Sequence, residues 1–185
     1  WYRSCTVMYS RRASRSNPPM DTFQALDAAR RRHSHPPAAG SDAEARAIDT
    51  FAAFFSSFAP DRIERLLPQT YADDIWFNDT LKTVVGREAL AHYLRESAAA
   101  VEHCSVEIID VTRNPEGEYL LRWRMTIRFK RFKKGVDTQS IGLSHLRFDA
   151  EGRVVYHQDY WNAADGLFRH IPVLGWMIEA VLRRV

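Results

Sequence analysis

The sequence predicts an α+β domain in which helices pack on one face of a curved antiparallel sheet. Three observations support this prediction. The first half of the chain carries apolar residues at helical spacing, whereas the second half carries four longer runs typical of strands, separated by turns rich in Gly, Asn and Asp. The chain has 185 residues, which is enough to bury one core. We therefore expect a single domain without internal repeats.

Residues 1–40 are expected to form a disordered basic leader and linker. This segment holds seven Arg and two Asp, so the rest of the chain carries a net charge of −2 although the whole chain carries +3. The basic pI near 9.0 is thus a property of the leader, and we expect no nucleic-acid partner. A short helix over residues 21–32 and an organellar transit peptide are the alternatives for this segment.

The cysteine content and hydropathy bear on the compartment. Cys5 lies in the leader and Cys104 begins a predicted strand, so a structural disulfide is not expected. No apolar run is long enough to span a bilayer. We expect a cytoplasmic location, with organellar import and peripheral membrane association as alternatives.

The ordered domain is expected to begin at Ser41 and to end at residue 162. Ser41 followed by Glu44 predicts a capping box, and the helix that it starts ends before Pro60. Asp61 is expected to cap a short second helix that ends around residues 67–68. A third helix follows Gly86 and presents one face made of Leu90, Tyr93, Leu94 and Ser97.

The predicted strands follow from β-branched and aromatic runs between turn residues. A short hairpin is expected around Asp79-Thr80, with strands at 75–78 and 82–85. Four longer strands then form a meander, because the segments 114–117, 133–135 and 149–152 carry turn residues. These strands are expected at residues 104–113, 118–132, 136–148 and 153–161.

The last hairpin, residues 141–161, is the centre of the predicted site. Because side chains alternate along a strand, His157 and Asp159 share one face with Val155 and Trp161. The other face carries Val154, Tyr156, Gln158 and Tyr160. Both faces hold large apolar groups, so we expect both to be covered. An imidazole and a carboxylate facing a covered interior are typical of a polar site inside an apolar pocket.

The order of elements resembles that of the nuclear transport factor 2-like superfamily. The residues that carry the resemblance are 71–79 (YADDIWFND), 86–90 (GREAL), 146–149 (LRFD) with Gly152-Arg153, and Tyr160-Trp161. Residues 41–162 are most similar to the ketosteroid isomerase and SnoaL-like polyketide cyclase branch. The resemblance implies a cone-shaped fold with a deep apolar pocket for a small lipophilic molecule, often in a homodimer.

The resemblance also implies roles for single residues. Asp79 falls on the position of the proton-abstracting Asp of ketosteroid isomerases. Their two oxyanion donors, a Tyr on the first helix and an Asp on the penultimate strand, are missing, because the strand position holds Ser144. The loss of such donors raises the barrier by a few kcal/mol each, which argues against steroid isomerisation itself. Asp159 with His157 is similar to the late-strand Asp and nearby His of the cyclases.

Asp79, His157 and Asp159 are therefore the predicted catalytic residues of a general acid/base site. The alternative is structural: His157 and Asp159 satisfy each other, and Asp79 caps a hairpin turn. We expect a cofactor-independent isomerase, cyclase or dehydratase acting on a small lipophilic carbonyl compound, or alternatively a non-catalytic binding protein. No metal is expected, because the histidines lack zinc-ligand spacing. The predicted ligand contacts are Phe55, Trp76, Tyr93, Trp123, Ser144 and Trp161.

Two further stretches are open to more than one interpretation. The alternating residues Arg122, Arg124, Arg128 and Lys130 predict a basic stripe, interpreted as a solvated outer face in preference to a phosphate-binding surface. Residues 163–185 predict an apolar helical extension. A helix over 172–185 would be roughly 20 Å long, too short to cross a bilayer. It is expected to cap the pocket, to pack in a dimer, or to lie at a membrane surface with Trp176 and Arg183-Arg184 at headgroup level.

Overall fold

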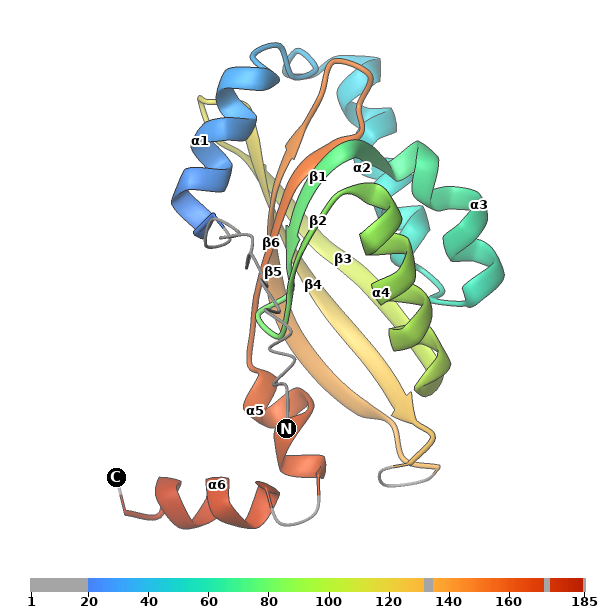
Figure 1. Cartoon of the computed structure of the whole chain (residues 1–185), viewed down its shortest axis with the longest axis vertical. Coiled ribbons are helices and arrows are strands. Elements are labelled where there is room, and N and C mark those ends of the chain that lie inside the picture. The colour runs from blue at the N-terminus through green and yellow to red at the C-terminus, as the bar shows by residue number, and fades with distance from the viewer. Residues whose placement is uncertain (1–19, 132–134, 172–173, 185) are drawn as a thin grey trace, which may run out of the picture.

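The computed structural model describes residues 20–131, 135–171 and 174–184. The predictions for residues 1–19, including Cys5, lie outside this range. A six-stranded curved sheet forms the centre of the molecule, with helices on both of its sides (Figure 1). The predicted α+β class is confirmed.

The strand order across the sheet is β2-β1-β6-β5-β4-β3. All neighbouring strands pair antiparallel except β1 and β6, which pair parallel. The sheet is therefore mixed and not purely antiparallel as predicted, because the closing strand returns beside the first one. The strands are β1 Tyr71–Asn78, β2 Thr83–Val85, β3 Val101–Arg113, β4 Glu118–Phe129, β5 Thr138–Phe148 and β6 Val154–Trp161.

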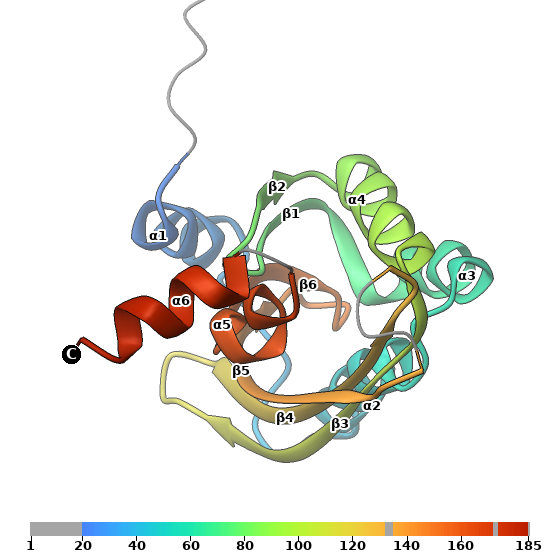
Figure 2. The ribbon, with the colours of Figure 1, turned by 90° about the horizontal axis from the view of Figure 1, so that it is seen from below.

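Three helices, α2 (Asp42–Phe55), α3 (Pro60–Thr70) and α4 (Arg87–Ala99), lie on the concave side of the sheet (Figures 1 and 2). Ser41 caps α2 as predicted, since its hydroxyl accepts a hydrogen bond from the Glu44 amide at 3.2 Å. The Glu44 carboxylate accepts a hydrogen bond from the amide of Gly40 at 2.6 Å. In a capping box it would bind the amide of Ser41, so the reciprocal bond is shifted by one residue. The predicted cap by Asp61 was wrong: α3 starts with Pro60 at its first position and has no side-chain cap.

The main core lies between these helices and the sheet. Its members are fully or almost fully buried apolar side chains, and they include large residues from every layer: Phe51, Phe54, Ile63, Tyr71, Ile75, Leu90, Tyr119, Leu121, Leu146 and Phe148. The apolar face of α2 reaches this core through Ala47, Phe51 and Phe54. Burial of such side chains stabilises the fold by about 1.5–3 kcal/mol each.

The part of the predicted leader that the structure describes contains the short helix that the sequence analysis gave as an alternative over residues 21–32. A helix, α1 (Thr22–Arg32), packs on the outer side of the sheet, opposite α2 to α4 (Figure 1). It begins with a capping box between Asp21 and Gln24. Its apolar residues form a second core with two strands, made of Ala25, Leu26, Ala29, Ala72, Trp76, Val155 and Tyr156. The sheet is thus covered on both faces of β6, as the last hairpin predicted.

Polar contacts hold α1 and the segment after it on the sheet. Arg30 pairs with the buried Glu118 on β4 at 2.5 Å. His33 pairs with Asp74 on β1 at 3.0 Å, and its carbonyl oxygen accepts two hydrogen bonds from Arg147. The N-terminal segment is therefore an integral layer of the fold.

An irregularity in β6 changes the predicted faces of two residues. The pairing with β5 shifts between Arg147 and Phe148, next to Val154. Val154 joins the core under α2, whereas Val155 joins Tyr156 in the core under α1. The prediction that Val155 shares the face of His157 was wrong, because the shift interrupts the alternation before Tyr156. From Tyr156 to Trp161 the predicted faces are as observed.

The C-terminal segment turns away from the sheet after Trp161. It contains α5 (Ala163–Gly166), a 3-10 turn η1 (Phe168–His170) and α6 (Leu174–Leu182). Seen from below, α5 lies under the open end of the curved sheet and α6 extends outward from it (Figure 2). The predicted C-terminal helix is present but shorter. Among the described residues, no helix is long and apolar enough to cross a membrane.

Candidate functional site

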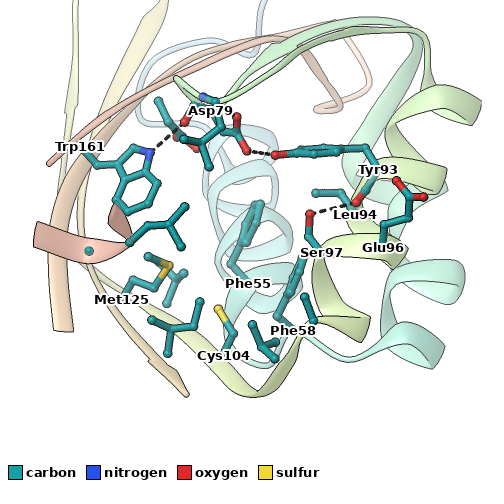
Figure 3. A pocket seen from close by; sticks show the side chains of 18 of the residues that line it. Phe55, Phe58, Asp79, Tyr93, Leu94, Glu96, Ser97, Cys104, Met125 and Trp161 are labelled. Atoms are coloured by element: carbon teal, nitrogen blue, oxygen red, sulfur yellow. Dashed lines mark hydrogen bonds between the residues drawn. The ribbon is translucent and has the colours of Figure 1, made fainter. Parts of the chain in front are cut away.

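A cavity of about 760 Å³ opens between the curved sheet, α2 and α4. Most of its wall is apolar and comes from helix residues such as Phe55 and Phe58 and from strand residues such as Met125 (Figure 3). A cavity of this size can enclose a small lipophilic molecule. Its polar wall residues include Asp79, Tyr93, Ser144, His157 and Asp159.

A continuous chain of hydrogen bonds runs along one wall of the cavity. The Tyr71 hydroxyl lies 2.9 Å from Nδ1 of His157, and Nε2 of His157 lies 2.7 Å from Oδ1 of Asp159. The same oxygen accepts a hydrogen bond from the Ser144 hydroxyl at 2.5 Å. Ser144 in turn accepts one from the Trp123 indole at 2.9 Å. Residues of β1, β4, β5 and β6 thus hold the Asp159 carboxylate in one place.

The direction of the hydrogen bonds of His157 follows from its neighbours. Burial, together with the nearby Asp159 charge, raises the pKa of Tyr71 well above its ordinary value, so Tyr71 keeps its proton. The hydroxyl can then donate to Nδ1, which leaves Nε2–H to donate to Asp159. His157 is 1% exposed, and its ring stacks on that of Tyr71 and makes an edge contact with that of Phe77. In this arrangement both of its ring nitrogens are engaged, so it orients Asp159.

Asp159 has a carboxylate oxygen that remains available to a bound molecule. Its Oδ1 accepts both hydrogen bonds, and within the described part of the chain its Oδ2 accepts none from a protein group. Its side chain is 16% exposed and lines the cavity. A carboxylate that is fixed by two donors on one oxygen and lines an apolar cavity is arranged to accept a proton from a bound molecule.

Asp79 lies in the turn between β1 and β2 and has two sets of partners. Its Oδ1 accepts hydrogen bonds from the amides of Leu81 at 3.0 Å and Lys82 at 2.9 Å, so the predicted turn cap is present. Its Oδ2 accepts a short hydrogen bond from the Tyr93 hydroxyl of α4 (Figure 3). Its carbonyl oxygen accepts one from the Trp161 indole at 2.8 Å. Asp79 therefore joins the turn, α4 and β6 at the cavity wall.

Tyr93 is a proton donor in this pair. Burial and the hydrogen bond to Asp79 raise the pKa of Tyr93 above its ordinary value. The hydroxyl consequently stays protonated and donates to the carboxylate. The Lys82 ammonium lies 4.9 Å from the centre of the Tyr93 ring, over its face.

The structure brings most of the predicted site residues together. Asp79, His157 and Asp159 line the same cavity, as do Phe55, Tyr93, Trp123, Ser144 and Trp161. Trp76 does not: it lies on the other side of the sheet, stacked on Tyr156 at a ring distance of 5.2 Å under α1. The reason is strand alternation, because its neighbour Phe77 takes the position that faces the cavity.

Sequence analysis did not identify Tyr71 as part of the site. The parallel pairing of β1 with β6 brings it to His157, and Tyr71 is opposite Val154 in that register. A tyrosine that begins a run of strand residues was visible in the sequence, but its partner 86 positions away was not. Such a parallel pair has no local sequence signal, since its strands are far apart along the chain.

The described residues support neither a cysteine nucleophile nor a metal site. Cys104 lines the cavity, but burial raises the pKa of its thiol to about 12, so it stays protonated and is a poor nucleophile. No group of three or more His, Cys, Asp or Glu among the described residues could hold a metal ion.

The three arginines of the predicted basic stripe lie on β4 and are paired with carboxylates, whereas Lys130 lies at the cavity lining. Arg122 binds Asp110 at 2.9 Å, Arg128 binds Asp137 at 2.8 Å, and Arg124 lies 3.8 Å from Glu107. The stripe therefore carries much less net charge than its sequence indicates.

The fold and the cavity define a member of the nuclear transport factor 2-like class, with a curved sheet and helices around one apolar pocket. The SnoaL-like domain family matches residues 51–157, which is more than half of the chain. The chain belongs to this family. The comparison with curated proteins found no match.

Solved structures with the same fold are distant in sequence. A protein with a ketosteroid isomerase-like fold from Catenulispora acidiphila, in complex with trimethylamine, is 20% identical with a TM-score of 0.56, covering 65% of this chain and 88% of that one. An epoxide hydrolase of the LEH-like type from Mycobacterium tuberculosis is 16% identical with a TM-score of 0.54, covering 76% and 96%. A protein named as a SnoaL-like polyketide cyclase from Shewanella denitrificans is 16% identical with a TM-score of 0.55, covering 68% and 94%. These likenesses show the fold alone.

Proposed function

We propose that this protein is a cofactor-independent enzyme that moves a proton within a small lipophilic carbonyl compound, with Asp159 as the general base. The observation that carries the proposal is that only one of the two carboxylate oxygens of Asp159 accepts hydrogen bonds from the described residues. Its Oδ1 is held by His157 and Ser144, its Oδ2 accepts no hydrogen bond from the described residues, and the residue lines the apolar cavity. Such fixed donors hold a base in a reactive position at no cost of reorganisation during the reaction.

His157 has a positioning role in this proposal. It contacts Asp159 through Nε2 and Tyr71 through Nδ1, so neither ring nitrogen is available to a substrate. Its ring donates a hydrogen bond from Nε2 to the carboxylate and holds Asp159 in place. This is a refinement of the prediction that His157 itself transfers protons.

Tyr93 and Asp79 would supply the electrophilic side of the site. When Asp159 removes a proton next to a carbonyl group, negative charge develops on the carbonyl oxygen. Tyr93 can turn its hydroxyl from Asp79 to that oxygen, and Asp79 keeps its two amide donors. The proton on Asp159 would then return to another carbon or to a leaving oxygen. Isomerisation, cyclisation and dehydration differ only in this last step.

The charges of the cavity favour a neutral substrate. Among the described residues, the cavity wall carries the carboxylates of Asp79, Glu96 and Asp159, whereas its cations, Lys130 and Arg131, lie at exposed positions of the lining. A carboxylate or phosphate placed beside Asp159 would be repelled. The names polyketide cyclase and epoxide hydrolase, which belong to two proteins of the same fold, agree with neutral lipophilic substrates.

The test uses nitrobenzisoxazole as a reporter of a base in an apolar cavity. The base removes the ring C–H proton, the N–O bond breaks, and a nitrile and a coloured phenolate form. We expect the parent protein to accelerate this reaction and Asp159→Asn to lose at least about 100-fold. Asp110→Asn is the matched control, because Asp110 lies on the outer face with Arg122. Equal rates in the parent and in Asp159→Asn would contradict the proposal.

A second candidate is a non-catalytic binding protein for a lipophilic ligand. This function is favoured by His157 and Asp79, because each of these polar groups already has its hydrogen-bond partners within the protein. Native mass spectrometry of the purified protein would distinguish the two functions together with the reporter assay. A retained lipophilic molecule, combined with no Asp159-dependent turnover, would support the binding protein.

A further inference from the structure

The outer face of α6 is apolar and exposed. Trp176, Met177 and Val181 are 72%, 51% and 62% exposed. Residues 176, 177, 180 and 181 share one side of a helix because its period is 3.6 residues. Within the described chain α6 packs mainly against η1, so this side contacts no other layer of the protein. Three large apolar side chains next to one another in water are unfavourable, and such patches mark interaction sites.

This apolar face belongs to a helix at the same end of the molecule as the mouth of the cavity (Figures 1 and 2). Gly166 and Leu167 of the α5 segment line the cavity, and the chain continues from them through η1 into α6. The exposed lining residues Leu81, Ala99 and Ala100 mark the mouth, because they belong to both the cavity and the surface. In Figures 1 and 2, α5, α6 and the C-terminal end of α4 lie at the same end of the molecule.

The exposed charges at this end include four basic residues, and also Glu96, which lines the cavity and lies 3.4 Å from His92. Lys130 and Arg131 are exposed at the cavity lining, and Arg183 and Arg184 are exposed at the end of α6. Two nearby carboxylates are already paired: Glu179 lies 3.4 Å from Arg169, and Asp137 binds Arg128. Exposed apolar residues surrounded by arginine and lysine fit the boundary between anionic headgroups and acyl chains.

We infer that the mouth end of the protein docks on an anionic lipid bilayer through α6. Trp176, Met177 and Val181 enter the headgroup boundary, and Arg183, Arg184, Lys130 and Arg131 contact the phosphate groups. A lipophilic molecule can then pass between the bilayer and the cavity without crossing water, where its transfer is costly. This inference holds whether the cavity is catalytic or only binds a ligand.

Co-sedimentation with vesicles tests the inference with the full-length protein. We expect pelleting with phosphatidylcholine vesicles that contain phosphatidylglycerol, and much less with phosphatidylcholine alone. The double variant Trp176→Glu with Val181→Glu is expected to reduce the partition coefficient about tenfold or more. The control is Phe23→Glu with Ile141→Glu, since these residues are equally exposed but lie on α1 and β5, and pelleting should be unchanged.

A second variant keeps the test independent of the apolar substitutions. Arg183→Glu with Arg184→Glu should weaken binding to anionic vesicles and reduce its dependence on salt. Equal pelleting of the parent and both α6 variants, or no pelleting of the parent, would overturn the inference. So would sedimentation velocity that shows a dimer lost in Trp176→Glu with Val181→Glu, because α6 would then be covered by a second copy.

Discussion

The Nε2 atom of His157 lies 2.7 Å from Oδ1 of Asp159, its neighbour but one on β6. Two side chains on one face of a strand are about 6–7 Å apart at their origins, so both must lean toward each other to meet. Tyr71 on β1 fixes the far side of the imidazole and Ser144 on β5 fixes the carboxylate. The site thus depends on three neighbouring strands.

Removing the Tyr71 hydroxyl tests this dependence. Tyr71→Phe leaves Nδ1 of the buried His157 without its partner, and we expect a loss of about 1–3 kcal/mol in the free energy of unfolding. The turnover of nitrobenzisoxazole should also fall, because His157 is then held only through Nε2 and fixes the Asp159 carboxylate less firmly. Urea unfolding and initial rates measure the two effects. Tyr160→Phe, at an exposed position of β6, should change neither.

Tyr93→Phe tests the donor side of the cavity. The substitution removes the hydroxyl that binds Asp79 and that would stabilise negative charge on a bound oxygen. We expect turnover to fall about 100-fold, as for the loss of an oxyanion donor. Binding of the fluorescent dye Nile red should change little, because the ring remains. Unchanged turnover would exclude Tyr93 from the proposed mechanism.

Gly142→Ala tests the packing behind the site. A Cβ atom at this position would lie 2.3 Å from the Trp123 ring, so the indole would have to move. Its hydrogen bond to Ser144 would be lost, and we expect a destabilisation of about 1–3 kcal/mol with weaker Nile red binding. In a Trp123→Leu background the same substitution should cost much less. A double-mutant cycle of unfolding free energies measures the difference.

Leu26→Ala tests whether α1 contributes to stability. Leu26 is buried against the outer side of the sheet, and its truncation should cost about 2–4 kcal/mol. Phe23→Ala on the same helix should stay within about 0.5 kcal/mol, since Phe23 is exposed. If both variants unfold at the parent's urea concentration, α1 is not held on the sheet in solution.

Acid should release the N-terminal segment before the rest of the domain. Burial by itself raises the pKa of Glu118, but hydrogen bonds from Arg30, Asn114 and His145 outweigh it, so the pKa is below its ordinary value of 4.5. A carboxylate with a lowered pKa in the folded state stabilises the fold above that ordinary value. The contribution is lost as the pH falls below about 4.5 and through the folded pKa. His33 and Arg32 lower the pKa of Asp74 against the effect of its burial, which adds to the same loss.

Tryptophan fluorescence and limited proteolysis between pH 6 and pH 3 would follow this release, because Trp76 lies under α1. In Glu118→Gln the segment should already be loosened at neutral pH, and the acid-dependent step should become smaller. A transition that is the same in the parent and in the variant would show that Glu118 does not control it.

Much of the fold could be predicted because the signals are local. The cap at Ser41, the turn glycines and the alternation in the last hairpin identified most helices and strands within a few residues. The faces of His157, Asp159 and Trp161 followed from the period of a strand. These three residues line the cavity as expected.

The remaining features depend on contacts that are distant along the chain. The parallel register of β1 on β6 places Tyr71 at His157 and turns Trp76 away from the cavity. The composition of residues 20–40 resembles a leader, but three small or apolar residues of α1 complement the outer face of β1 and β6. No local pattern shows such complementarity, because it exists only after the sheet has formed.

The position of α1 also affects how the protein should be produced in the laboratory. The family match begins at residue 51, so a recombinant fragment designed from it would omit α1. Ala72, Trp76 and Val155 would then face water, and the carboxylate of Glu118 would lose Arg30. Such a fragment would expose an apolar outer surface and tend to aggregate, even though its cavity residues were all present.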